Sequence, residues 1–120
     1  MGQVNPNGTY NGRVYDSGES NDASLTISAS DPQTGNISQA SMQYYGLNFK
    51  VDGTFAYENL TDESAVTFNL RAEASSAEHN VLIISMRSPD RNYFGLNGTF
   101  RVDRGGPNVG KTYNIEFRKN

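Results

Sequence analysis

The chain has 120 residues, with 13 acidic and 10 basic side chains, a formal net charge of −3 and no cysteine. By size scaling, a chain of this length buries roughly 65% of its unfolded surface, so we expect one domain, 1–120, that needs no disulfide bond. The acidic balance and the scattering of the basic residues argue against a phosphate-binding surface, and no nucleic-acid partner is expected.

Residues 1–20 carry no export signal. They lack the basic start and the run of roughly seven or more apolar residues of a secretory signal peptide. We therefore expect either an intracellular protein or a secreted one whose leader was removed, and the compartment stays undetermined. No stretch approaches the ~20 apolar residues that cross a bilayer, so no membrane-spanning helix is predicted.

A short motif occurs three times: asparagine or aspartate, glycine, threonine and an aromatic residue. The copies are Asn7-Gly8-Thr9-Tyr10, Asp52-Gly53-Thr54-Phe55 and Asn97-Gly98-Thr99-Phe100. Asn-Gly and Asp-Gly tolerate the positive φ of a tight hairpin turn, and threonine followed by an aromatic residue favours a strand. The recurrence predicts a β-meander. At Gly53 two interpretations stay open, a hairpin turn or a bulge inside one long strand.

Apolar and polar residues alternate along most of the chain, which is the pattern of half-buried strands. The predicted strands are 24–30, 37–45, 47–52 with a continuation at 55–57, 66–72, 81–84, 93–96, 99–103 and 111–118. A turn at 31–36 joins the first two, and 73–80 is a longer connection that suits a short helical turn. Together with the strand that the first motif copy opens at Thr9-Tyr10, these are eight to ten strands, depending on how the glycines are interpreted. Because closure removes unpaired edges, we predict an all-β fold: an antiparallel meander closed into a small barrel of about eight strands, with a β-sandwich as the alternative.

Two segments of the chain, 44–52 and 93–103, are similar. Each opens with two aromatic residues followed by glycine, leucine and asparagine. In a functional interpretation they form equivalent platforms that stack on sugar rings or planar ligands. In a structural interpretation, strands with similar roles have converged on similar sequences. The candidate ligand-binding residues are the aromatic and amide side chains of both copies: Tyr44, Tyr45, Asn48, Tyr93, Phe94 and Asn97.

The first third of the chain resembles avidin-like and other calycin barrels. The likeness rests on Gly8-Thr9-Tyr10-Asn11, on Ser24-Leu25-Thr26-Ile27 as the second strand and on Thr34-Gly35 at the start of the third. The resemblance implies an eight-stranded up-and-down barrel that binds small molecules at one open end. It implies no biotin site, because Ile37 stands where avidins carry a biotin-contacting tyrosine and the chain has no tryptophan. Only the architecture is carried over.

Residue types suited to catalysis or metal binding are scarce. With no cysteine and one histidine, His79, in a polar stretch, neither a cysteine nucleophile nor a histidine-rich metal site is expected. No Gly-x-Ser-x-Gly elbow is present, and the acidic pairs 62–63 and 73/78 are interpreted as surface carboxylates. The acidic segment 16–22 offers oxygen ligands for a hard cation, but a flexible hairpin connection is the favoured interpretation. We predict a protein that is not an enzyme, with no catalytic residue, cofactor or metal site.

Binding remains, and two hypotheses stay open. In the first, a non-catalytic module recognises a small ligand or a glycan at the end loops of the barrel. In the second, a protein-interaction or self-assembling barrel has a filled interior, and its oligomeric state is undetermined. Bulky inward residues are expected to fill the barrel and to favour a shallow site at the end loops or on the surface; they are Phe49, Phe55, Phe68, Ile84, Phe100 and Phe117.

Overall fold

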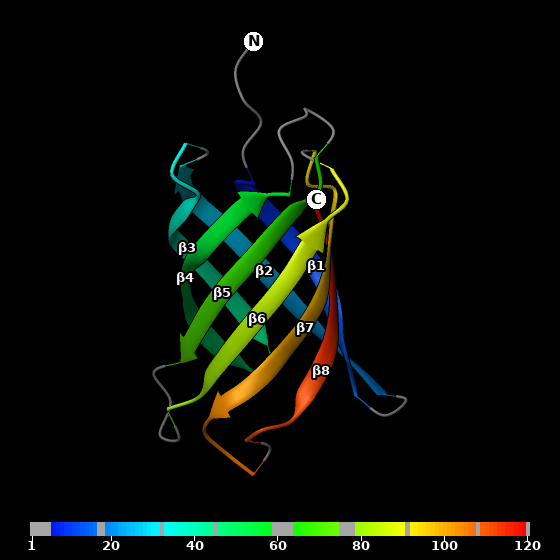
Figure 1. The fold of residues 1–120 in the computed structure, drawn as a ribbon. Coiled ribbons are helices and arrows are strands. Elements are labelled where there is room, and N and C mark those ends of the chain that lie inside the picture. The colour runs from blue at the N-terminus through cyan, green and yellow to red at the C-terminus, as the bar shows by residue number, and fades with distance from the viewer. Residues whose placement is uncertain are drawn as a thin grey trace.

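The computed structural model describes residues 6–16, 19–31, 33–44, 46–58, 64–74, 79–90, 92–107 and 109–119. They form eight strands: β1 (Gly8–Asp16), β2 (Glu19–Asp31), β3 (Asn36–Tyr44), β4 (Leu47–Tyr57), β5 (Val66–Ala74), β6 (Val81–Ser88), β7 (Gly95–Arg104) and β8 (Thr112–Lys119). Each strand pairs antiparallel with the next, and β8 pairs with β1, so the sheet closes into a barrel (Figure 1). Among these residues no helix is long and apolar enough to span a membrane. The predicted closed meander is confirmed, and the β-sandwich alternative is wrong.

The connections between strands lie at two ends of the barrel, because the chain reverses direction after every strand. At the upper end of Figure 1, β1 begins, β8 ends, and β2 connects to β3, β4 to β5 and β6 to β7. The other four connections lie at the lower end. The predicted turn at 31–36 is confirmed at the upper end, where the amide of Gly35 donates to the carbonyl oxygen of Asp31 at 2.8 Å.

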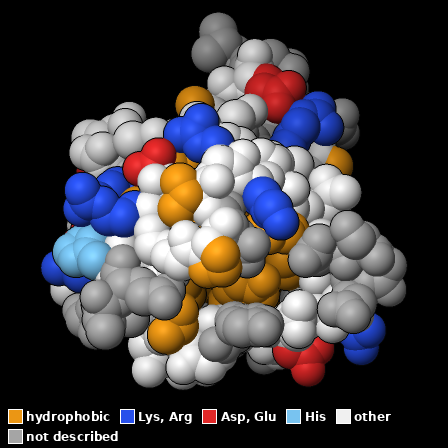
Figure 2. Space-filling model, turned by 90° about the horizontal axis from the view of Figure 1, so that it is seen from below, with side chains coloured by type: hydrophobic (Ala, Val, Ile, Leu, Met, Phe, Trp, Pro, Cys, Tyr) orange, Lys and Arg blue, Asp and Glu red, His pale blue; other side chains and the backbone are white. Residues whose placement is uncertain are grey.

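Side chains fill the barrel interior. Along β5, every second residue is buried: Val66, Phe68, Leu70, Ala72 and Ala74. The six bulky residues expected to fill the interior are at most 4% exposed. Near the lower end, the ring of Phe100 contacts the rings of Tyr44 and Tyr113, with centroids 5.5 and 5.4 Å away. Figure 2 shows hydrophobic side chains in the middle of this end, so the apolar interior extends to it.

The glycines of the repeated motif do not form hairpin turns, which corrects the prediction. Gly53 lies inside β4 and Gly98 inside β7, so 93–96 and 99–103 are not separate strands, and 47–57 is one long strand. Gly53 itself is not a bulge, because it pairs in regular register with Leu70; the register shift beside it comes from an extra residue of β3, between Ile37 and Ala40. A Cβ on Gly53 would lie 2.2 Å from the carbonyl oxygen of Asn69, and one on Gly98 would lie 1.9 Å from that of Ser85. Glycine is needed here because the neighbouring backbone approaches too closely for a side chain.

The aromatic residue of each motif copy has a common role. It follows the glycine by two positions, so it faces the same side of the strand. In all three copies that side is the barrel interior, and the aromatic residues are buried: Tyr10, Phe55 and Phe100. The motif thus combines a close approach between strands with a large ring that fills the space inside.

Candidate functional site

The candidate residues of the two similar segments lie at opposite ends of the barrel (Figure 1). Tyr44 ends β3 and Asn48 follows the first residue of β4, at the lower end. Asn97 lies near the start of β7, at the upper end. Tyr45 lies outside the described residues. The two segments therefore do not line one barrel mouth together.

At the upper end, the two aromatic candidates face different surroundings. Tyr93 has a positive φ of 58° and a fully buried ring, which meets the ring of Phe68 edge-on with centroids 5.9 Å apart. Phe94 is 70% exposed, and its carbonyl oxygen accepts a hydrogen bond from the amide of Lys119 at 2.9 Å. Tyr93 therefore packs the interior, whereas Phe94 and Asn97 face solvent.

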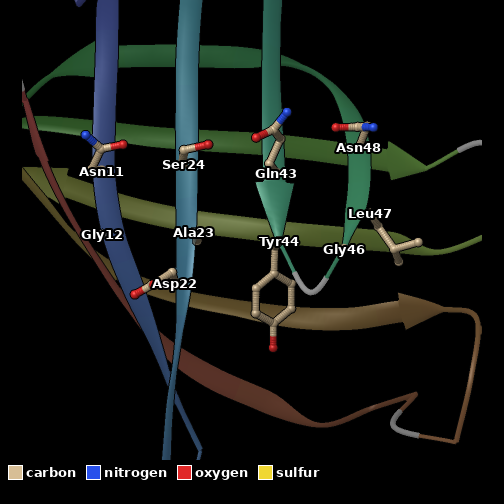
Figure 3. A pocket seen from close by; sticks show the side chains of 10 residues that line it. All are labelled: Asn11, Gly12, Asp22, Ala23, Ser24, Gln43, Tyr44, Gly46, Leu47 and Asn48. Atoms are coloured by element: carbon tan, nitrogen blue, oxygen red, sulfur yellow. The ribbon is translucent and has the colours of Figure 1, made fainter.

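On the outer face of the barrel, four polar side chains form one row across four strands. The antiparallel register pairs Asn11 of β1 with Ser24 of β2, and Ser24 with Gln43 of β3. Gln43 in turn pairs with Asn48 of β4. Ser24 is half-buried and the other three are exposed. Figure 3 shows the four side chains side by side. We call these four residues the amide row.

The amide row lines an open hollow of about 600 Å³, which we call the main hollow. Its floor is the adjacent register row, in which glycine or inward-directed side chains leave the backbone facing outward: Gly12, Ala23, Tyr44 and Leu47. Asp22 lies beyond this floor, with a carboxylate oxygen 3.7 Å from Nε of Arg13. Since both side chains are exposed, this ion pair contributes little to stability. The main hollow therefore has a backbone floor with the amide row along one side and the carboxylate of Asp22 on the other.

Two carboxyl groups with shifted pKa values lie outside the main hollow. The carboxylate of Glu58 accepts hydrogen bonds from Arg87 at 2.8 Å and from Thr67 at 3.0 Å, and these bonds lower its pKa. A hydrogen bond from Arg71 likewise lowers the pKa of Glu73. These contacts connect outer-face side chains near β4, β5 and β6.

The described residues contain no cluster of three or more histidine, cysteine, aspartate or glutamate side chains that could hold a metal ion. His79 is half-exposed, with Nε2 2.7 Å from the carboxylate of Glu73. Of the acidic segment 16–22, Asp22 pairs with Arg13, and residues 17–18 lie outside the described part. The acidic pair 62–63 and residue 78 also lie outside it.

Comparisons with known proteins supply no relative from which a function could be taken. No protein-family model, curated protein or solved structure matches the chain. The function is therefore inferred from the geometry and chemistry of the site.

Sequence reasoning singled out only part of the main hollow. It named Tyr44 and Asn48, but it missed Asn11, Ser24 and Gln43. Their outward direction follows from alternation, but their meeting depends on the register of four strands. The signal that could have found them is the length of the turns, because turn length fixes the register of each hairpin.

Proposed function

We propose that the protein is a non-catalytic binding module that recognises a glycan in the main hollow, on the outer face of β1–β4. The amide row carries this proposal. It aligns two asparagines, one glutamine and one serine along a hollow of about 600 Å³.

The chemistry of the amide row suits a ligand that is rich in hydroxyl groups. Each asparagine or glutamine side chain has a carbonyl acceptor and an NH₂ donor, and serine both donates and accepts. A sugar hydroxyl also donates and accepts, so such a wall can pair with successive hydroxyls whichever way they point. Neighbouring strands lie about 4.8 Å apart, so the four side chains span about 14 Å, which favours an oligosaccharide over a single small molecule.

The filled interior supports an outer site. Aromatic and aliphatic side chains occupy the space in which a calycin barrel would hold its ligand. The likeness to avidin-like barrels that we retain is one of architecture, and Ile37, at the position of the avidin tyrosine, is 2% exposed. The proposed site therefore moves from the end loops to the outer face, where Tyr44 contributes backbone and Asn48 a side chain.

An array of neutral glycans, followed by calorimetric titration of the ligands found, tests the proposal. Gln43→Ala removes the third side chain of the amide row and about two hydrogen bonds. At about 0.5–1.5 kcal/mol per bond, the expected loss of affinity is about tenfold. The matched control is Asn69→Ala, which removes an exposed amide from the outer face of β5, away from the main hollow.

The control should bind as the unchanged protein does, and both variants should keep their unfolding temperature, because the replaced side chains are exposed. The proposal is wrong if no glycan binds at millimolar concentration, or if Gln43→Ala and Asn69→Ala have the same effect.

A second candidate function, self-association or protein interaction, is favoured by one observation. Phe94 presents a ring that is 70% exposed at the upper end, and exposed aromatic rings are enriched at protein interfaces. If this ring forms an interface, Phe94→Asp should reduce the mass seen in light scattering after size exclusion. An unchanged mass would remove the support that Phe94 gives.

A further inference from the structure

A second hollow extends the main hollow onto the last strand. It has a volume of about 220 Å³ and shares Asn11 and Gly12 with the main hollow. Its other lining residues are Arg13 and Tyr15 of β1 and Glu116 and Arg118 of β8. We call it the β8 hollow.

The two hollows form one continuous path across the strands. The register pairs Asn11 with Arg118, so the amide row continues onto β8. The floor also continues, because Gly12 pairs with Phe117, whose side chain is buried. Gly12 carries no side chain, so nothing interrupts the floor where the hollows meet.

Tyr15 gives the β8 hollow an aromatic wall. It follows the buried Val14 on β1, so it faces outward, and it is 42% exposed. Its hydroxyl donates to a carboxylate oxygen of Glu116 at 3.3 Å, which restrains the ring. The faces of an aromatic ring carry partial negative charge, and the C–H groups on one face of a pyranose ring are slightly positive. A ring held in this way can therefore stack on a sugar.

The charges of the two hollows taken together are balanced, because Arg13, Arg118 and Glu116 line the β8 hollow and Asp22 lines the main hollow. A guanidinium nitrogen of Arg118 lies 3.6 Å from the carboxylate of Glu116, and Nε of Arg13 lies 3.7 Å from the carboxylate of Asp22. At these distances and exposures the pairs are loose, so the arginines can donate to sugar hydroxyls and the acids can accept from them. An anionic ligand would face the two carboxylates, and a cationic one the two arginines. A neutral ligand meets neither repulsion.

We propose that the β8 hollow is a further sugar subsite, in which Tyr15 stacks on one ring of a linear, neutral oligosaccharide lying across β8, β1, β2, β3 and β4. This inference rests on the glycan binding proposed above and deepens it. Tyr15 of β1 lies three strand spacings, about 14 Å, from β4, and it lies four residues, about 13 Å, along β1 from Asn11, the residue aligned with Asn48, so a monosaccharide cannot contact both Tyr15 and Asn48. Affinity must therefore rise with the length of the ligand until it reaches both hollows.

The test titrates the full chain with cello-, malto- and manno-oligosaccharides of two to six residues. For the oligosaccharide series that binds, the affinity of the unchanged protein should rise at least tenfold from the shortest to the longest ligand. Tyr15→Ala should remove most of that gain. Tyr15→Phe keeps the ring and should retain the gain, and Asn69→Ala, which removes an exposed amide of β5 outside both hollows, should change nothing.

The outcomes separate the inference from the function on which it rests. If Gln43→Ala weakens binding but Tyr15→Ala leaves the gain with length intact, the glycan function stands and the β8 subsite is wrong. If none of these series binds and no glycan of the array binds either, both are wrong; if a glycan of the array binds with an affinity that does not rise with its length, only the β8 subsite is wrong. Oligogalacturonates of the same lengths test the ligand charge, and tenfold tighter binding of these anions would overturn the choice of a neutral ligand. A lowered unfolding temperature would show that Tyr15→Ala does not fold. In that case the subsite is tested by the gain in affinity with ligand length in the unchanged protein and in Tyr15→Phe, and a gain absent from both would overturn it.

Discussion

Single glycines set how closely the strands of this barrel approach one another. At Gly98 the carbonyl oxygen of Ser85 on the next strand occupies the place of a Cβ, whereas at Gly46 no atom lies within 4 Å of that place. Both are glycines, but the first is required by a neighbouring backbone and the second only by its positive φ of 76°.

This difference predicts unequal costs for two alanine substitutions. Gly98→Ala must displace the backbone of β6, and we expect a loss of about 2–3 kcal/mol of unfolding free energy, typical of overpacking. Gly46→Ala meets only the left-handed backbone conformation, for about 1 kcal/mol. Urea unfolding of both variants measures the difference, and equal costs would contradict the role assigned to Gly98.

The buried hydroxyl of Tyr10 makes the stability of the protein depend on pH. Its hydroxyl donates to the carbonyl oxygen of Pro6 at 2.6 Å, and burial raises its pKa. Because the folded pKa lies above the unfolded one, the stabilisation by the neutral phenol is complete below about pH 10 and is lost as the pH rises above it.

We therefore expect the pH dependence of stability to differ between the unchanged protein and Tyr10→Phe. At pH 8 the variant should be less stable by about 1 kcal/mol, the worth of the lost hydrogen bond. Above pH 10 the unchanged protein should lose about 1.4 kcal/mol per pH unit relative to the variant. Urea titrations between pH 8 and pH 11 measure both curves, and parallel curves would contradict the burial of Tyr10.

At the scale of strands and hairpins, local sequence patterns predicted where the strands lie better than which residues of different strands come into contact. Alternation placed 24–30, 66–72 and 111–118 within or close to β2, β5 and β8, because the side-chain period of a strand is visible in the sequence. The glycine in β7 was misinterpreted as a turn, and the glycine in β4 was left open between a turn and a bulge inside one strand. The backbone that approaches them belongs to another strand, so no local pattern reveals it.

The candidate residues of the two similar segments do not form one site, and the reason is related. The two similar segments lead into β4 and β7. In a meander, strands three places apart run in opposite directions, so these segments open at opposite ends of the barrel. The sequence could show this only with the correct strand count, which the interpretation of Gly98 as a turn obscured. The amide row needed the register of three hairpins as well.

Hydrogen bonds between outer-face side chains connect neighbouring strands, and one set predicts an acid-sensitive contact. Glu58 follows β4 and accepts from Thr67 on β5 and Arg87 on β6, which lowers its pKa. With the folded pKa depressed, its stabilisation is present at neutral pH and lost as the pH falls through the folded pKa. Glu58→Gln should thus lower the unfolding temperature at pH 7, and the difference should shrink as the pH falls below the ordinary glutamate pKa of about 4.3. A difference that stays constant into acid pH would exclude the ionised carboxylate as its cause.

For the whole molecule, closure of the barrel determines which of its surfaces another molecule can bind. All eight strands pair on both sides, so none offers an unpaired edge to a strand from another chain. Recognition must then use side chains at the ends or on the outer face. The main hollow and the β8 hollow lie next to the seam where β1 and β8 close the barrel.

The seam itself carries a prediction. A Cβ on Gly12 would lie 1.8 Å from the carbonyl oxygen of Glu116, so Gly12→Ala must push β1 and β8 apart. Amide hydrogen exchange should accelerate most in the β1–β8 pairing and least in the β4–β5 pairing on the far side. A uniform change in protection would show that closure does not depend on Gly12.

We propose above all that this filled barrel binds its ligand on its outer face. Amide chemical shifts during titration with the longest oligosaccharide that binds test this most directly, because they report location as well as binding. We expect shifts concentrated at Asn11, Gly12, Ser24, Gln43 and Asn48, extending to Tyr15 and Arg118. Shifts confined to buried residues such as Phe100 and Tyr113, or to the upper end around Phe94, would contradict it.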